Sequence, residues 1–532
     1  MRTNGVAGNW AWWAFLLTGM LTVFVYAQLW KRSGVLTDVE FYELRYSGKS
    51  AAFLRGFRAI YLGFLFNVVI MATVSLAAIK ISGVLMGLSP VETVVIAGVI
   101  TVIYSSLGGL RGVLLTDFFQ FFLSIIGGIA AAWVALQHPD VGGLSGLLTH
   151  EAVIPRLNIL PDFSDPAQAI GVFIIPLAVQ WWSVYYPGAE PGGGGYVAQR
   201  MFAAKDEANS IAAVFFFQAA HYALRPWPWI IVALCSIVVF PDIASIREAF
   251  PSAAGVADHD MGYPAMLTFL PTGLLGLVVA SLTAAYMSTI STHLNWGSSY
   301  LVNDFWKRFV RPESTENELV NVGRLSTVLL MIVAGALALW MENALDSFQI
   351  LLQIGAGTGL LFILRWFWWR INAWSEIAGM AISFAVAVWF QFFHEAAGLP
   401  ALTGWQELVC GVAFTTAVWL LVTYLTRPTA QDTLVEFCRI ARPGGPGWQP
   451  VLDKADREGR EVEMLQREKW SVPQGILCMV LGCVAIYSAL FATGYWIYGE
   501  WVLAGVLTAT MVGSSWGLYY AWRKLIGIRK FN

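Results

Sequence analysis

The chain has 532 residues, of which 57% are hydrophobic and 12% are charged, about half of the charged fraction found in ordinary soluble proteins. Its net charge of −2 gives no sign of a basic surface, so we expect no nucleic-acid partner. The sequence lacks the HExxH motif and a complete GxxxxGK[ST] phosphate loop, and its five cysteines lack metal-ligand spacing. We therefore expect a membrane protein that is not an enzyme.

Apolar runs of the length needed to cross a bilayer recur along the whole chain. Because only helices and closed barrels satisfy their backbone groups in lipid, these runs predict an all-α polytopic membrane protein. We expect about thirteen transmembrane helices, at 10–30, 53–82, 91–107, 112–136, 167–187, 209–240, 272–302, 322–341, 345–366, 374–393, 405–426, 474–492 and 499–522.

The basic residues between these spans indicate how the chain crosses the membrane. If the chain starts on the outer side, 27 of the 32 Lys and Arg residues fall on the inner side, in loops or at the inner ends of spans, and three fall in outer loops. An excess of basic residues is typical of cytoplasmic loops. The distribution therefore supports both the span count and the orientation, and it predicts a cytoplasmic C-terminus.

A hydroxyl-rich stretch from Ala280 to Phe305 lies within one of these apolar runs. Residues three and four positions apart share one face of a helix, so Ala285, Ser288 and Thr289 would present a backbone carbonyl and two hydroxyl oxygens together. Neutral oxygens inside a membrane protein suit a small monovalent cation. The alternative is that these are small packing residues whose hydroxyls bond to their own helix.

Four motifs follow one another along the chain: ITVIYSSLGGLRGVLLTDFFQFF at 100–122, YVAQRMFAAKDEANS at 196–210, MSTISTHLNWGSS at 287–299 and ELVNVGR at 318–324. In content, order and spacing they resemble the sodium:solute symporter family. The resemblance implies a leucine-transporter-like core of two inverted five-helix repeats. It also implies sodium-coupled symport of a small polar organic solute by alternating access. Na⁺ would bind at the three residues named above, and no cofactor other than this coupling ion is implied.

The resemblance also implies an organisation in four segments. These are a transporter core with core helices 2–10 at 1–369, two accessory transmembrane helices at 370–426, a cytoplasmic loop at 427–472 and a C-terminal transmembrane pair at 473–532. The family's leading helix and first core helix, which supplies the other part of the ion site, would precede this sequence. We expect either a start placed too late or a fragment. The expected location is the plasma membrane, as a bacterial inner membrane protein.

Aromatic residues before a glycine-rich break form one set of candidate substrate-binding residues. Trp181, Trp182, Tyr185 and Tyr186 precede the break at 187–195, in the segment that the resemblance assigns to a discontinuous sixth core helix. These rings would stack on a solute or close over it. The alternative is an aromatic belt at the membrane interface.

Arg225 is the other candidate for contact with the solute. It lies midway through a predicted span, beside Pro226 and Pro228. An arginine near the midplane is costly and is by default a functional hypothesis, which here favours an anionic or polyhydroxyl solute. A carboxylate partner elsewhere in the bundle would instead make Arg225 structural.

Other features have simpler interpretations. The 104–117 segment is expected to turn tightly at Gly108 and Gly109 between two spans, and His293 is expected to be a hydrogen-bonded core residue. The expected partners are a small solute, Na⁺ and the lipid bilayer, with no protein partner evident. The rival function is a non-transporting membrane sensor module or an inactive, N-terminally truncated transporter fragment.

Overall fold

A computed structural model describes residues 1–251, 255, 257–341, 344–462 and 470–530, without the side chains of 104, 106–113, 116, 344–348 and 528–530. Within these residues the regular structure is helical, apart from one isolated antiparallel bridge between Val184 and Ala356. The predicted all-α class is therefore confirmed.

The chain forms two compact units whose segments alternate along the sequence. Unit 1 comprises Met1–Asn9, Gly56–Asp162 and Arg225–Phe348, and unit 2 comprises Trp10–Arg55, Phe163–Leu224 and Gln349–Asn532. The sequence analysis divided the chain into four consecutive segments, whereas each of these units combines segments from different parts of the chain. The boundaries of the four expected segments stay predictions. Each unit is described by itself below.

Unit 1 is built mainly from long helices. Its α-helices are the last part of α5 (Gly48–Ile60), α6 (Asn67–Met86), α7 (Pro90–Leu136), α8 (Gly143–Thr149), α13 (Pro226–Val239), α14 (Ile243–Ala249), α15 (Gly262–Leu267), α16 (Thr272–Ser299), α17 (Glu316–Ala338) and the start of α18 (Ala344–Gly355). Its π-helical and 3₁₀ segments are η1 (Val6–Asn9), η3 (Tyr61–Phe66), η4 (Ile154–Arg156), η9 (His259–Met261) and η10 (Tyr300–Val310).

Unit 2 contains more interrupted helices. Its α-helices in the first two segments are α1 (Trp10–Trp13), α2 (Phe15–Leu21), α3 (Ala27–Ser33), α4 (Phe41–Arg45), the first part of α5, α9 (Pro166–Ala169), α10 (Trp181–Ser183), α11 (Gly195–Ala203) and α12 (Glu207–Ala219). The third segment holds the rest of α18, α19 (Gly359–Leu364), α20 (Ala373–Val388), α21 (Gly404–Leu425), α22 (Gln431–Ala441), α23 (Gln449–Arg457), α25 (Val472–Tyr498) and α26 (Trp501–Lys530). Its π-helical and 3₁₀ segments are η2 (Thr22–Tyr26), η5 (Ile170–Ile174), η6 (Pro176–Gln180), η7 (Ala220–Leu224), η11 (Trp389–Phe393) and η12 (Pro446–Trp448).

Ten helices in the described part of the chain are long and apolar enough to cross a membrane. They coincide with ten of the thirteen predicted spans. The predicted span at 91–107 corresponds to the shorter apolar helix Pro90–Ile103. The segments at 167–187 and 345–366 are also helical, but each is interrupted by extended or turn residues. The count of thirteen crossings therefore stays a prediction.

The turn expected at 104–117 is wrong. Helical hydrogen bonding continues through Gly108 and Gly109, so that α7 runs unbroken for 47 residues. At 1.5 Å per residue such a helix is more than twice as long as the hydrocarbon core of a bilayer is thick. Glycine permits a turn but does not impose one, because it also accepts helical dihedral angles at a modest cost.

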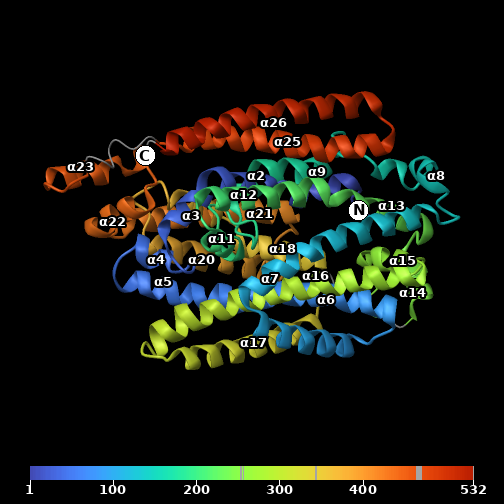
Figure 1. Ribbon diagram of the computed structural model, residues 1–532, viewed down its shortest axis with the longest axis horizontal. Coiled ribbons are helices and arrows are strands. Elements are labelled where there is room, and N and C mark those ends of the chain that lie inside the picture. The colour runs from blue at the N-terminus through green and yellow to red at the C-terminus, as the bar shows by residue number, and fades with distance from the viewer. Residues whose placement is uncertain (252–254, 256, 342–343, 463–469, 531–532) are drawn as a thin grey trace. The chain divides into compact units, whose positions relative to one another are not determined.

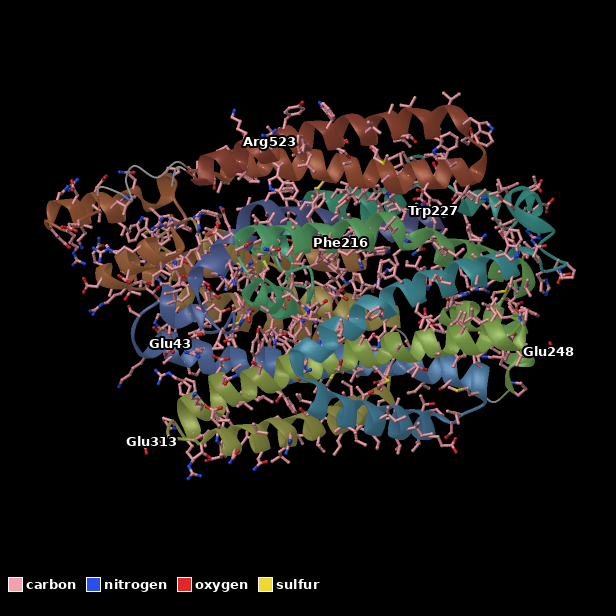
Figure 2. The ribbon with its side chains drawn as sticks, viewed as in Figure 1. Glu43, Phe216, Trp227, Glu248, Glu313 and Arg523 are labelled. Atoms are coloured by element: carbon pink, nitrogen blue, oxygen red, sulfur yellow. The ribbon has the colours of Figure 1, made fainter. Side chains whose placement is uncertain are left out.

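The core of unit 1 lies between α6, α16 and α17, which run alongside one another (Figure 1). Met71, Ile290, Leu294 and Leu330 form its fully buried centre. Figure 2 shows Glu248, on α14, and Glu313, after η10, at opposite ends of these long helices. Which of the two loops is outer and which is inner stays a prediction.

Unit 2 ends in a helical hairpin. Helices α25 and α26 run side by side (Figure 1) and turn at Gly499, whose φ of +79° is in the region that favours glycine. The 427–472 segment before this hairpin contains the helical elements α22, η12 and α23.

Candidate functional site

The three predicted sodium ligands lie on α16, which begins after Pro271 and continues into η10. The Thr289 hydroxyl donates a 3.0 Å hydrogen bond to the carbonyl oxygen of Ala285, one turn earlier in the same helix. Ala285 is exposed, whereas Ser288 and Thr289 are half-buried. For Thr289, the structure therefore shows the back-bonding that was the alternative interpretation of this stretch.

Ser288 has a partner on another helix. Its hydroxyl donates to the Asp117 carboxylate on α7. The two helices approach closely nearby, because a Cβ on Gly127 would already contact Val278 and Ser281. Sequence reasoning considered Asp117 only as part of the 104–117 segment. The motif that contains it was recognised, but the pairing with Ser288 was not predicted.

Ala285 and Thr289 line a cleft of about 450 Å³ within unit 1. The cleft lies between α6, the first half of α7 and α16, and most of its wall is aliphatic. Its polar groups include the hydroxyls of Ser82, Thr93 and Thr283. The predicted triplet is therefore divided, with two members on the cleft and Ser288 bonded to α7.

This arrangement has a defined chemical capacity. A hydroxyl that donates its proton keeps its acceptor lone pairs, and a carbonyl oxygen that accepts one hydrogen bond retains capacity for another interaction. Thr289 and Ala285 thus place two neutral oxygens 3.0 Å apart. Asp117, which accepts the hydrogen bond from Ser288, adds a negatively charged carboxylate. A negative charge in a low-dielectric environment attracts a cation strongly.

In unit 2 the predicted break is confirmed and meets a second break. The chain is non-helical between α10 and α11, and again at 356–358 between α18 and α19. The Tyr185 amide donates to the Gly355 carbonyl at 3.1 Å, and the Gly357 amide donates to the Ser183 carbonyl at 2.8 Å. The two breaks therefore satisfy part of each other's backbone, as interrupted membrane helices require.

The two tryptophans before this junction bond to their own helix. The indole N–H of Trp181 donates to the Leu177 carbonyl at 2.9 Å, and that of Trp182 donates to the Ala178 carbonyl at 2.7 Å. Both rings are half-buried. These hydrogen bonds do not prevent either ring from stacking on a ligand.

The two tyrosines pack against other rings of unit 2. Tyr185 is buried and meets Phe362 edge to face with ring centroids 5.6 Å apart. Tyr186 is half-buried and stacks on Phe15 at 5.5 Å. These contacts give both rings a structural function, so a solute would have to displace a partner or bind beside it.

Arg225 lies at a helix discontinuity, between η7 and α13. It follows η7 and occupies the N-cap position of α13, and its side chain is exposed. It begins a segment of unit 1, whereas the four aromatic candidates belong to unit 2. The two sets of candidate substrate residues therefore remain separate predictions.

Comparison with known proteins decides the family. The model of the sodium:solute symporter family matches residues 1–383. The chain belongs to the sodium:solute symporter family. Its class of activity is sodium-coupled solute transport across a membrane, with Na⁺ as the coupling ion, and it is not an enzyme.

Several curated relatives of this symporter are named after different solutes. A sodium/glucose cotransporter of Vibrio parahaemolyticus is 25% identical over 397 residues, which cover 71% of each chain. A sodium/proline symporter of Haemophilus influenzae is 27% identical over 354 residues, which cover 63% of this chain and 64% of the relative. A sodium/myo-inositol cotransporter 2 of Oryctolagus cuniculus is 28% identical over 323 residues, which cover 54% and 45% of the two chains.

The fold of this symporter also matches a solved structure. That structure is described as the substrate-bound outward-open state of a Na⁺-coupled sialic acid symporter. The match has a TM-score of 0.59 and 20% sequence identity, and it covers 80% of this chain and 86% of the other. At this identity the comparison supports the shared helical transporter fold.

Proposed function

We propose that this symporter moves a small polar organic solute across the plasma membrane by alternating access and uses Na⁺ bound beside α16. The contact that carries the proposal is the hydrogen bond from Ser288 to Asp117, because Ser288 directly precedes Thr289, whose hydroxyl is paired with the Ala285 carbonyl oxygen. It puts a carboxylate next to neutral oxygens on a helix whose Ile290 and Leu294 belong to the apolar core of unit 1.

The ion site would use Ala285, Ser288 and Thr289, with Asp117 supplying the negative charge. The predicted orientation places the C-terminus in the cytoplasm. A second group of ligands would complete the coordination, as the family resemblance implies. Binding of Na⁺ would then shift the balance between the outward- and inward-open states, because only a ligand with different affinities for two states changes their populations.

Contact with the solute is proposed separately for two sets of residues, Trp181, Trp182, Tyr185 and Tyr186 in unit 2 and Arg225 in unit 1. The paired breaks support the first four positions, since interrupted helices in transporters expose backbone groups to a solute. Arg225 at a helix discontinuity would favour an anionic or polyhydroxyl solute. Glucose, proline and myo-inositol, which are named for the relatives, are suitable first probes.

Sodium binding can be tested before the solute is known. The melting temperature of the purified chain in detergent would be measured against NaCl, with choline chloride holding the ionic strength constant. A ligand that binds the folded state raises the melting temperature in a saturable way. We expect saturable stabilisation by Na⁺ that the double variant Ser288→Ala, Thr289→Ala loses. Equal responses of the double variant and the parent would remove this site assignment.

A further inference from the structure

A buried polar pair joins α6 to α16 one turn beyond Thr289. The Asn67 side-chain amide donates to the His293 carbonyl oxygen at 2.7 Å, and the Asn67 amide oxygen lies 2.6 Å from His293 Nδ1. Asn67 is fully buried and His293 is 3% exposed. The expectation that His293 is a hydrogen-bonded core residue is therefore confirmed, but its partner could not be predicted.

The two bonds define the direction of each proton. Because the nitrogen of Asn67 donates to a carbonyl, its oxygen faces the His293 ring and can only accept. Nδ1 of His293 must therefore carry the proton. This reciprocal pair, here named the clasp, connects residues that are 226 positions apart in sequence.

Close helix contact makes the clasp possible. A Cβ on Gly297 would overlap the Asn67 side chain, and a Cβ on Gly63 would lie 3.0 Å from the Cβ of Tyr300. Small residues at this crossing let the two backbones approach. The π-helical segment η3 ends immediately before Asn67, and such segments often re-aim a side chain at a functional position.

A second polar contact joins the same helices within the segment that carries the ion-site residues. The Ser75 and Tyr286 hydroxyls are 3.3 Å apart, and both groups are buried. Helix α6 therefore holds α16 at two levels, one within Ala285–Thr289 and one a turn beyond it. Each residue turns a helix by about 100°, so two fixed levels determine which face α16 presents to α7 and to the cleft.

We propose that Asn67 and His293 are positioning residues for the coupling ion. They set the rotation of α16, so that Ser288 meets Asp117 while the oxygens of Ala285 and Thr289 face the cleft. This inference rests on the proposed ion site. Buried hydrogen-bonded pairs of this kind specify one arrangement of a core more than they add to its stability. Residues behind ion ligands commonly change the affinity for the ion when they are removed.

The test uses the full chain in detergent and Na⁺ alone, with the same melting titration in NaCl and choline chloride. His293→Phe keeps an aromatic ring but removes the donor, whereas His293→Asn places an amide nitrogen where Nδ1 was. We expect His293→Phe to raise the Na⁺ concentration at half-maximal stabilisation at least about ten-fold. We expect His293→Asn to stay within about three-fold of the parent, because the donor is restored.

A matched variant separates positioning from general packing. Thr423→Ala removes a buried hydroxyl on α21 of unit 2 that donates to the Ser375 hydroxyl on α20 at 2.7 Å. It should lower the melting temperature in choline chloride but leave the Na⁺ midpoint unchanged. If His293→Phe behaves like Thr423→Ala, the clasp is only structural and the inference is overturned.

The outcomes also separate this inference from the ion-site proposal. If Ser288→Ala with Thr289→Ala abolishes the Na⁺ response while His293→Phe retains the parent midpoint, the ion site stands and the positioning role fails. If the double variant keeps the parent midpoint, the ion site itself fails, and the inference fails with it. Support for the inference requires a lost response in the double variant, a shifted midpoint in His293→Phe and recovery in His293→Asn.

Discussion

The Ser288 hydroxyl on α16 donates a hydrogen bond to the Asp117 carboxylate on α7. These residues are 171 positions apart, and their contact gives a predominantly apolar helix pair a negative charge beside the proposed ion ligands. We predict that Asp117→Asn, which keeps the size and the acceptor oxygen, raises the Na⁺ midpoint about ten-fold or more because the attracting charge is gone. Melting titrations with Na⁺ check this value. An unchanged midpoint in Asp117→Asn would show that the carboxylate does not act on the ion.

The junction of the two helix breaks in unit 2 has no space for a side chain at Gly355. A Cβ there would overlap the backbone oxygen, carbon and nitrogen of Tyr185. Backbone atoms cannot rotate away as a flexible side chain can, so we predict that Gly355→Ala strongly lowers the melting temperature and impairs transport.

Gly505→Ala on α26 is the matched control, since a Cβ at Gly505 meets nothing within 4 Å. Alanine is favoured over glycine inside a helix by roughly 0.5–1 kcal/mol, so this control should be neutral or slightly stabilising. Equal melting temperatures for the two variants would show that the junction adapts.

Arg45 is enclosed by rings from α22 and η12. Its guanidinium carbon lies 4.7 Å from the Trp448 ring centre and 5.3 Å from that of Phe437, and its Nε donates to the Arg365 carbonyl at 2.9 Å. Trp448 is 1% exposed. Replacing it with alanine should release the segment that contains α22 and η12 from Arg45, because losing a buried tryptophan costs about 3–5 kcal/mol.

Cys438 reports the release of this segment, because it lies on α22 and is 3% exposed. In a Cys410→Ser background, which removes the exposed thiol, Trp448→Ala should accelerate maleimide labelling of Cys438. Trp501→Ala, at a ring that is 67% exposed, should leave the rate unchanged. If Cys438 of the Trp448→Ala variant is labelled as slowly as in the parent, the segment stays docked without the Trp448 ring.

A buried ion pair joins α20 to the end of α19. Arg365 Nη1 lies 3.4 Å from Glu376 Oε2, and the Tyr46 hydroxyl donates to Glu376 Oε1 at 2.5 Å. Arg365 and Glu376 are 3% and 1% exposed. Glu376→Gln would leave the buried guanidinium without its counter-charge, which typically costs about 3–5 kcal/mol.

We expect a large drop in the melting temperature of Glu376→Gln. Asp432→Asn, which breaks the Arg460–Asp432 pair at a carboxylate that is 82% exposed, should change the melting temperature little, because exposed pairs contribute about 0–1 kcal/mol. Similar small shifts in both variants would contradict a structural role for the buried pair.

Arg225 should affect the solute and not the ion. In proteoliposomes with an inward Na⁺ gradient, D-glucose, myo-inositol and L-proline serve as first probes of uptake. For a transported probe, we predict that Arg225→Gln raises the KM for the solute about ten-fold and leaves the Na⁺ midpoint unchanged, because a charged hydrogen-bond partner is lost. An unaltered KM would exclude Arg225 from the solute site.

The sequence by itself determined the membrane class, the helical spans, the break at 187–195 and the stretch from Ala280 to Phe305. These features follow from local composition and periodicity, because a bilayer selects long apolar helices wherever they occur. The turn at Gly108 and Gly109 could not be decided locally, since glycine is compatible with both a turn and a helix.

Only the tertiary structure decided the partners. Ser288 meets Asp117, His293 meets Asn67, and Gly355 meets Tyr185 across chain separations that no local pattern encodes. A hydroxyl or amide has the same short-range preferences wherever it stands, but its hydrogen-bond partner depends on which helix is packed against it. The sequence therefore indicated which oxygens to propose for an ion, and helix packing determined which partners they meet.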